Sequence, residues 1–158
     1  MDTRGRRFAP LRPRDWFEHG TLACHEWWSA FGNVCWVDYE TGAWEQPPVA
    51  DAQAAHVWGP RPLCHAHCDR TGRWWCADES PYKWHKQPCE VLFYDRTTRR
   101  ETRIVSAMAK PPMPRQPYHL DPHPQFTPDG NYIAYTTFDR GAVDVALAPT
   151  APLKATVA

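Results

Sequence analysis

The sequence has 158 residues, of which 18 are Lys or Arg and 18 are Asp or Glu, so its formal net charge is zero. A nucleic-acid partner is not expected, because proteins that neutralise phosphates need a clustered basic excess. The mean hydropathy is −0.66 and no apolar run is long enough to span a bilayer, so a membrane partner is not expected either. Hydrophobic residues make up 42% of the chain, which is too many for a disordered protein.

The first 14 residues are basic, but no apolar stretch follows them, so they do not have the pattern of a secretory signal. A cytoplasmic location is expected on this ground. In a reducing compartment, the six cysteines are expected to be buried free thiols rather than disulfides. They are Cys24, Cys35, Cys64, Cys68, Cys76 and Cys89.

Short runs of β-branched and aromatic residues follow one another along the chain, separated by turn-forming residues. No segment has a sustained apolar period of about 3.6 residues, and the 17 prolines disfavour long helices. The sequence therefore predicts an all-β fold. The predicted strands cover residues 33–39, 43–45, 72–78, 91–94, 101–105, 131–137 and 142–148.

Three of these strands follow a small turn, at Gly32, Gly72 and Gly130, with intervals of about 40 to 58 residues. Propeller blades have about this length, and a closed ring needs about four to eight of them. We predict a partial β-propeller of about three four-stranded blades; a small irregular β-sandwich is the alternative. The blades are assigned to residues 21–150, after a poorly ordered N-terminal extension (1–20) and before a flexible tail (151–158). Self-association through the unpaired flanks is expected.

A candidate metal site lies in the segment before the predicted strand 131–137. His119, Asp121 and His123 alternate along a stretch that prolines hold extended. In an extended chain such residues project to one side, and two imidazoles with one carboxylate suit a divalent ion such as Mn²⁺ or Zn²⁺. The alternative is that all three are ordinary polar residues of a loop.

Two further segments contain candidate ligands. His25 lies close in sequence to two tryptophans, Trp27 and Trp28. A histidine beside aromatic residues is commonly packed and hydrogen-bonded, which is the alternative to a role as a ligand. Residues 64–68, Cys-His-Ala-His-Cys, offer four donors, but these are too close together to surround one tetrahedral zinc ion easily. One of the two histidines in this segment is expected to face the same channel as His119.

Three segments together resemble the oligogalacturonate lyase family, propeller enzymes that cleave pectin-derived oligouronides. Residues 24–28, Cys-His-Glu-Trp-Trp, resemble the family's Gly-His-Glu-Phe-Trp stretch. Residues 63–78 resemble its Cys-Ser-His segment with the turn and strand that follow. Residues 121–130 resemble its His-Pro-His-Pro-x-Phe-Thr-Pro segment, and the whole resemblance covers residues 20–150.

The resemblance implies a seven-bladed propeller that holds one Mn²⁺ through three histidines and one glutamine. It places His25 and His123 on two of these histidines and Asp121 on the third. The glutamine falls on Tyr118, which is a poor ligand, so the adjacent His119 is taken in its place. The predicted metal ligands are therefore His25, His119, Asp121 and His123.

The resemblance also implies a reaction, the β-elimination of an oligogalacturonide substrate in pectin degradation. A base removes the proton at C5 while a bound cation neutralises the neighbouring carboxylate. The family's base and its arginine partner fall in earlier blades, so the chain is expected to be a truncated form, and its catalytic residues are not identified.

Two other functions stay open from the sequence. One is a non-catalytic TolB-like propeller fragment that binds a sugar or a protein partner. The other is a zinc-stabilised β module that uses the four donors of residues 64–68.

Overall fold

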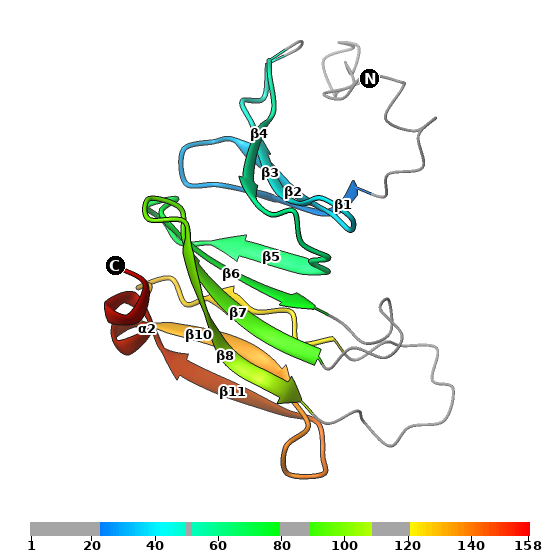
Figure 1. Cartoon of the computed structure of the whole chain (residues 1–158), viewed down its shortest axis with the longest axis vertical. Coiled ribbons are helices and arrows are strands. Elements are labelled where there is room, and N and C mark those ends of the chain that lie inside the picture. Colours follow the sequence, from blue (N-terminus) through cyan, green and yellow to red (C-terminus); the bar gives the residue numbers. More distant parts are fainter. Residues whose placement is uncertain (1–22, 50–51, 80–88, 109–120) are drawn as a thin grey trace, which may run out of the picture.

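The computed structural model describes residues 23–49, 52–79, 89–108 and 121–158; the predicted N-terminal extension (1–20) lies outside them. The described residues form three antiparallel sheets that stack on one another in chain order (Figure 1). The first sheet contains β1 (Ala23–Trp28), β2 (Val34–Asp38), β3 (Gly42–Gln46) and β4 (Ala55–Trp58). The second contains β5 (His65–Cys68), β6 (Trp74–Glu79), β7 (Cys89–Asp95) and β8 (Arg100–Met108). The third contains β9 (Gln125–Phe126), β10 (Tyr132–Thr137) and β11 (Asp144–Pro149).

Each sheet is a meander in which strands that are consecutive in sequence pair with each other. Successive small sheets stacked face to face are the architecture of propeller blades. The prediction of an all-β partial propeller with about three blades is therefore confirmed. Each predicted strand overlaps an observed one, whereas β1, β4, β5 and β9 were not predicted. Three of these four have four to six residues and β9 has two, so they give little periodic signal.

The middle sheet is buried on both faces, and β6 shows why its sequence is apolar without alternation. Trp75 and Ala77 pack toward the first sheet, in a core with Val37 of β2. Trp74 and Cys76 point the other way and pack against Ile133 of the third sheet. A strand between two neighbours needs apolar residues at both odd and even positions, which is a property of the stack and not of one sheet.

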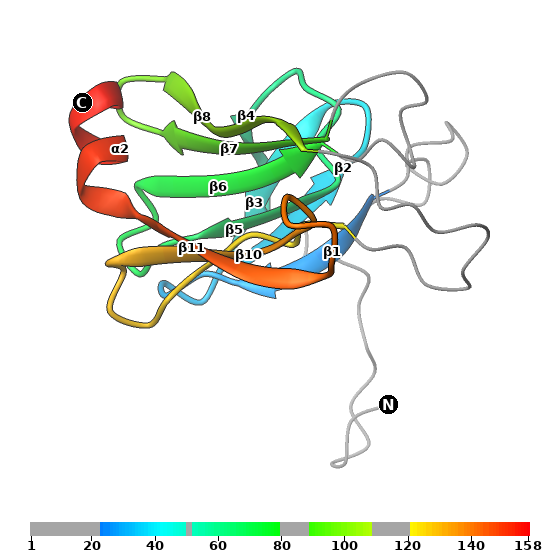
Figure 2. The ribbon, with the colours of Figure 1, turned by 90° about the horizontal axis from the view of Figure 1, so that it is seen from below.

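The C-terminal residues differ from the expected flexible tail, because they form the helix α2 (Thr150–Val157). Figure 2 shows α2 at the same end of the molecule as the turn between β7 and β8. Val157 is 1% exposed and belongs to the core between the second and third sheets. Thr98 and Arg100 donate hydrogen bonds to carbonyls at the end of the helix. A buried anchor and these caps hold an eight-residue helix that the sequence pattern does not reveal.

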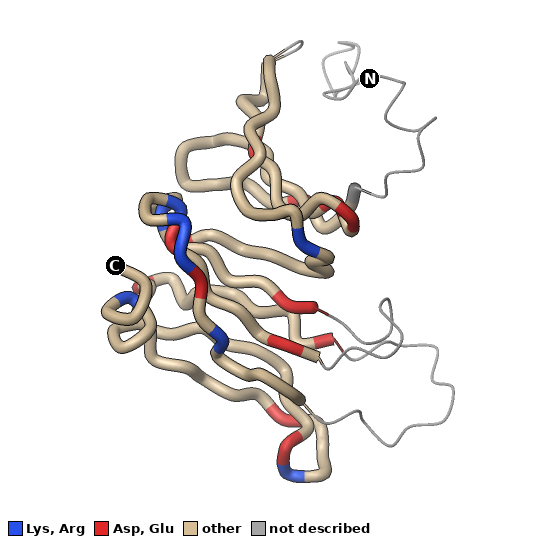
Figure 3. The backbone as a smooth tube through the Cα atoms, viewed as in Figure 1, with Lys and Arg blue, Asp and Glu red and all other residues tan. Residues whose placement is uncertain are grey.

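The outer face of the third sheet carries exposed apolar side chains. Val145 and Leu147 on β11 are 68% and 60% exposed, and Tyr132 on β10 is 43% exposed. Self-association through this flank stays a prediction. Lys and Arg instead gather at the turn between β7 and β8 and along β8 (Figure 3). Among the described residues, no helix is long and apolar enough to cross a membrane.

An ion pair at the end of β7 gives the fold a measurable pH dependence. Arg73 donates to both carboxylate oxygens of Asp95, with distances of 3.0 and 2.7 Å, and the Thr97 backbone N–H donates a further bond. The arginine first, and then the Thr97 amide, lower the pKa of the buried Asp95 from 3.8 to about 2. The unfolded chain thus takes up this proton at a higher pH than the folded chain does, so stability is lost as pH falls from 4 to 2.

We expect Asp95→Asn to lower the free energy of unfolding by about 1.5–3 kcal/mol near neutral pH, the contribution of a hydrogen bond to a charged group. The difference from wild type should shrink between pH 4 and pH 2, where the wild-type carboxylate becomes protonated. Urea unfolding of both proteins across this pH range measures the difference in their free energies of unfolding. A difference that does not change with pH would contradict the assignment.

Candidate metal centre

The first strands of the three sheets lie side by side and bring distant histidines together. β1 contacts β5, and β5 contacts β9. In a propeller the innermost strand of each blade faces the central channel. His25 lies on β1, His65 begins β5, and His123 stands two residues before β9. Three blades therefore each contribute one imidazole to the same place.

The three rings lie close together. The ring centroid of His65 is 4.1 Å from that of His25 and 3.5 Å from that of His123. The ring centroids of His25 and His123 are 6.2 Å apart. Two sets of residues each have ligand atoms that all lie within 4.8 Å of one another. One set is His65, Asp121 and His123, and the other is His25, Cys64 and His65. Imidazole, carboxylate and thiolate are all zinc ligands, and carboxylate also suits manganese. The donor set fits a divalent cation.

A buried carboxylate holds the shared histidine in place. Asp78 of β6 is fully buried, and both of its oxygens lie 3.0 Å from Nδ1 of His65. It also accepts hydrogen bonds of 2.8 Å from the backbone N–H groups of His65 and His123. With Nδ1 donating to Asp78, the Nε2 lone pair of His65 is directed to the site. This is the carboxylate–histidine arrangement that orients metal ligands in proteins.

Two of the histidines have an unusual backbone. His25 and His123 have φ angles of 55° and 45°, in the left-handed region that costs a non-glycine residue about 1–3 kcal/mol. His25 lies where the register of β1 against β2 shifts between Cys24 and Trp27. Such a bulge turns a side chain away from the direction that regular alternation would give it. Both strained positions carry a histidine that points to the same site.

The state of His25 suits coordination. Burial first, and then the neighbouring His65 and His123, lower the pKa of His25 from 6.5 to about 4, so this ring is neutral at neutral pH. Its Nε2 lies 2.9 Å from the hydroxyl of Tyr39, whose pKa is raised, chiefly by burial. If Nε2–H donates to that hydroxyl oxygen, the lone pair of Nδ1 is left for a cation.

A cavity of about 190 Å³ adjoins the three histidines. Its described lining also includes Glu26 and His67, but no lysine or arginine. The Phe126 backbone N–H donates to Nδ1 of His67 over 3.4 Å, so the neutral ring carries its proton on Nε2. Burial lowers the pKa of His67 and favours this neutral form. His67 is thus placed to donate a hydrogen bond into the cavity.

Of the four predicted ligands, Asp121 and His123 belong to one set with His65, and His25 belongs to the other set with His65. His119 lies outside the described residues. His65 was considered as a channel residue but was not in the predicted set. The signal for it was the segment of residues 64–68, one of whose two histidines was expected to face the channel. The zinc module of residues 64–68 is not supported by the described residues, because His67 and Cys68 join neither set of ligands. None of the six cysteines is in a disulfide, and five of them are buried.

No family model matches the sequence, and neither does any curated protein. Solved structures match its fold. An oligogalacturonate lyase from Vibrio parahaemolyticus matches with a TM-score of 0.66 and 17% identity, over 84% of this chain and 36% of the lyase. TolB from Acinetobacter baumannii matches with a TM-score of 0.57 and 13% identity, over 84% of this chain and 31% of TolB. A chain of a nidogen/laminin complex matches with a TM-score of 0.54 and 10% identity, over 82% of this chain and 45% of that one. These likenesses show a propeller-like fold. This chain spans about a third of the length of the first two of these structures.

Proposed function

We propose that the protein binds one divalent cation in the propeller channel and that the cation serves the β-elimination of oligogalacturonides. The observation that carries the proposal is the convergence of His25, His65 and His123 from three blades, with His65 oriented by the buried Asp78. The resemblance of three sequence segments to oligogalacturonate lyases, and the fold shared with one, support the substrate class.

The cavity explains why such a reaction would depend on a metal. An oligogalacturonide is anionic, and the described lining offers Glu26 but no lysine or arginine to bind a carboxylate. A bound cation would supply the missing positive charge and make the proton next to the uronate carboxylate more acidic. His25, His65, His123 and Asp121 would hold it. His67, with its proton on Nε2, would donate a hydrogen bond to a sugar oxygen.

A second candidate function has a specific observation in its favour. β-Elimination needs a general base within hydrogen-bond reach of the proton. Among the described residues of the cavity, three histidines are candidate ligands and His67 presents a donor, so only Glu26 could accept a proton. With only this one candidate base in the described lining, the second candidate is a metal-dependent sugar-binding propeller, in which the cation and His67 hold the uronide but no elimination follows.

One experiment separates the two functions. The purified protein, loaded with Mn²⁺ or Zn²⁺, is incubated with digalacturonate, and the unsaturated product is followed by its ultraviolet absorbance. Product formation that a chelator abolishes supports the lyase. Metal-dependent binding of digalacturonate without product supports the binding propeller. Absence of metal binding contradicts both.

His123→Ala tests the site within this experiment. His123 is exposed and its backbone, not its side chain, bonds to Asp78, so the fold should survive the change. We expect the metal affinity to fall by about tenfold or more, the lower end of what loss of a supporting residue costs. Metal content by mass spectrometry and circular dichroism check the two parts. Unchanged metal content would count against the site.

A further inference from the structure

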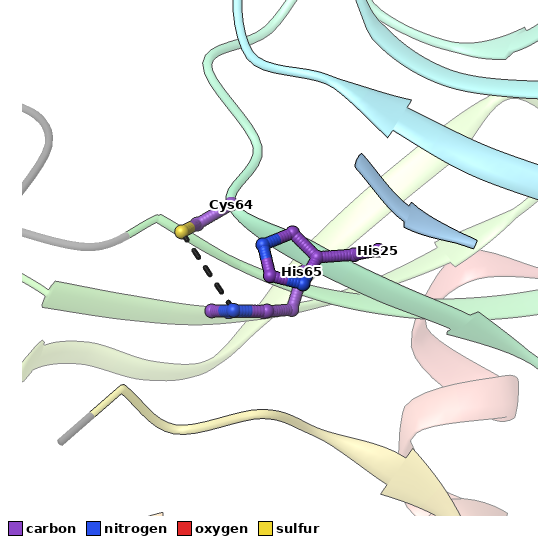
Figure 4. A group of neighbouring side chains, drawn as sticks. All are labelled: His25, Cys64 and His65. Atoms are coloured by element: carbon purple, nitrogen blue, oxygen red, sulfur yellow. Dashed lines mark hydrogen bonds between the residues drawn. The ribbon is translucent and has the colours of Figure 1, made fainter. Parts of the chain in front are cut away.

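One cysteine belongs to the proposed metal centre and gives it a different character from a site of imidazoles and carboxylates. Cys64 is 2% exposed and immediately precedes β5. Its Sγ lies 3.9 Å from Nε2 of His65. Figure 4 shows the thiol of Cys64 and the ring of His25 on the same side of the His65 ring. The ligand atoms of these three residues lie within 4.8 Å of one another.

The two sets of ligands share one residue, His65. Nδ1 of that ring is held by Asp78, so Nε2 is the nitrogen left for a cation. An ion on this nitrogen would be within reach of Cys64 and His25, which form one set with His65. These three donors and a solvent molecule would complete a tetrahedral site.

We infer that Cys64 is a ligand of this ion and that it makes the site select Zn²⁺ over Mn²⁺. This rests on the proposed metal site. Thiolate is a soft donor that suits zinc, whereas manganese is suited by carboxylate, carbonyl and water. When the Zn–S bond forms, the thiol releases its proton to solvent, so no oxidant or reductant is needed. Zinc remains a Lewis acid, and the chemistry proposed for the channel is compatible with it.

The other end of β5 offers a matched control. Cys68 is buried like Cys64, but it packs in the core between the first and second sheets and accepts a hydrogen bond from Trp27 Nε1 over 3.4 Å. A serine at this position can still accept that bond. Cys68→Ser therefore tests the loss of a buried thiol without touching the proposed ligands.

Cobalt spectroscopy tests the inference without reference to activity. We expect the purified wild-type chain with Co²⁺ to show the near-ultraviolet charge-transfer band of a sulfur–cobalt bond. Cys68→Ser should keep the band, whereas Cys64→Ser should lose it and still bind Co²⁺ through its imidazoles. In competition, Cys64→Ser should lower the affinity for Zn²⁺ by at least about tenfold and leave that for Mn²⁺ unchanged.

The outcomes separate this inference from the proposed function. Co²⁺ bound by wild type without the band overturns the role of Cys64 and leaves the imidazole site standing. No Co²⁺ binding by wild type overturns the site itself. A band that persists in Cys64→Ser or disappears in Cys68→Ser assigns the sulfur to another cysteine and also overturns the inference. If Cys64→Ser does not fold, a wild-type spectrum without the band still overturns the inference.

Discussion

Replacing His65 by alanine is expected to weaken metal binding more than any other single change, by more than about 100-fold. His65 is the one residue that both sets of ligands share, and Nε2 is its nitrogen that does not contact Asp78. The loss of this nitrogen leaves two partial sets with no common atom. Changes to the orienting residues around a metal already cost about 10–100-fold, so removing the central ligand should exceed that range.

Equilibrium dialysis with metal analysis measures the effect, and His56→Ala is the matched control. His56 is an exposed histidine on β4, the outermost strand of the first sheet, and it contacts Trp44 and the carbonyl of Thr41. The His56→Ala variant should bind metal as the wild-type protein does. An affinity of His65→Ala that equals the control would show that the channel histidines do not hold the ion.

Asp78→Asn should lower the metal affinity by about 10–100-fold although Asp78 does not itself belong to either set of ligands. The carboxylate accepts from Nδ1 of His65, which fixes the proton on that nitrogen. An amide of the same shape would present its NH₂ group to the ring as a donor. The ring would then respond by moving its proton to Nε2, where it blocks the lone pair that binds the metal.

The same substitution should also reduce stability by about 1–3 kcal/mol, because buried N–H groups of His65 and His123 lose part of a charged acceptor. Asp69→Asn provides the control. Asp69 is a buried aspartate at the other end of the β5–β6 hairpin, where it accepts from the Thr71 hydroxyl and the Trp74 backbone. The Asp69→Asn variant should lose a comparable amount of stability and keep the metal affinity of the wild-type protein. Equal affinity losses in both variants would mean that Asp78 acts only through the fold.

The chemistry of the channel follows from its charges. With the His25 ring neutral at neutral pH and no lysine or arginine in the described lining of the cavity, a positive charge there would have to come from a bound ion. The positive φ angles of His25 and His123 show that the backbone is strained where these rings enter the site. Such strain is retained when the rest of the fold fixes it, here through the bulge in β1 and the bond from His123 N–H to Asp78.

Local patterns in the sequence were sufficient for the strands and for part of the site. The run before Asp38 and the turn at Gly42 predict a hairpin because β-branched and aromatic residues and turn residues act over a few positions. His25 and His123 were found from short motifs that resemble a known family. The helix α2 was missed because its stability comes from Val157 in a core made by other sheets and not from its own sequence.

His65, Cys64 and Asp78 could be assigned only from the tertiary structure. In the sequence, Asp78 ends a strand like any polar residue, and nothing marks it as fully buried between segments 13 and 45 residues away. Pairing within a hairpin is a local event, whereas the meeting of β1, β5 and β9 depends on how whole sheets stack. The sequence therefore contains the residue types of the site, but the packing of the blades decides which of them come close together.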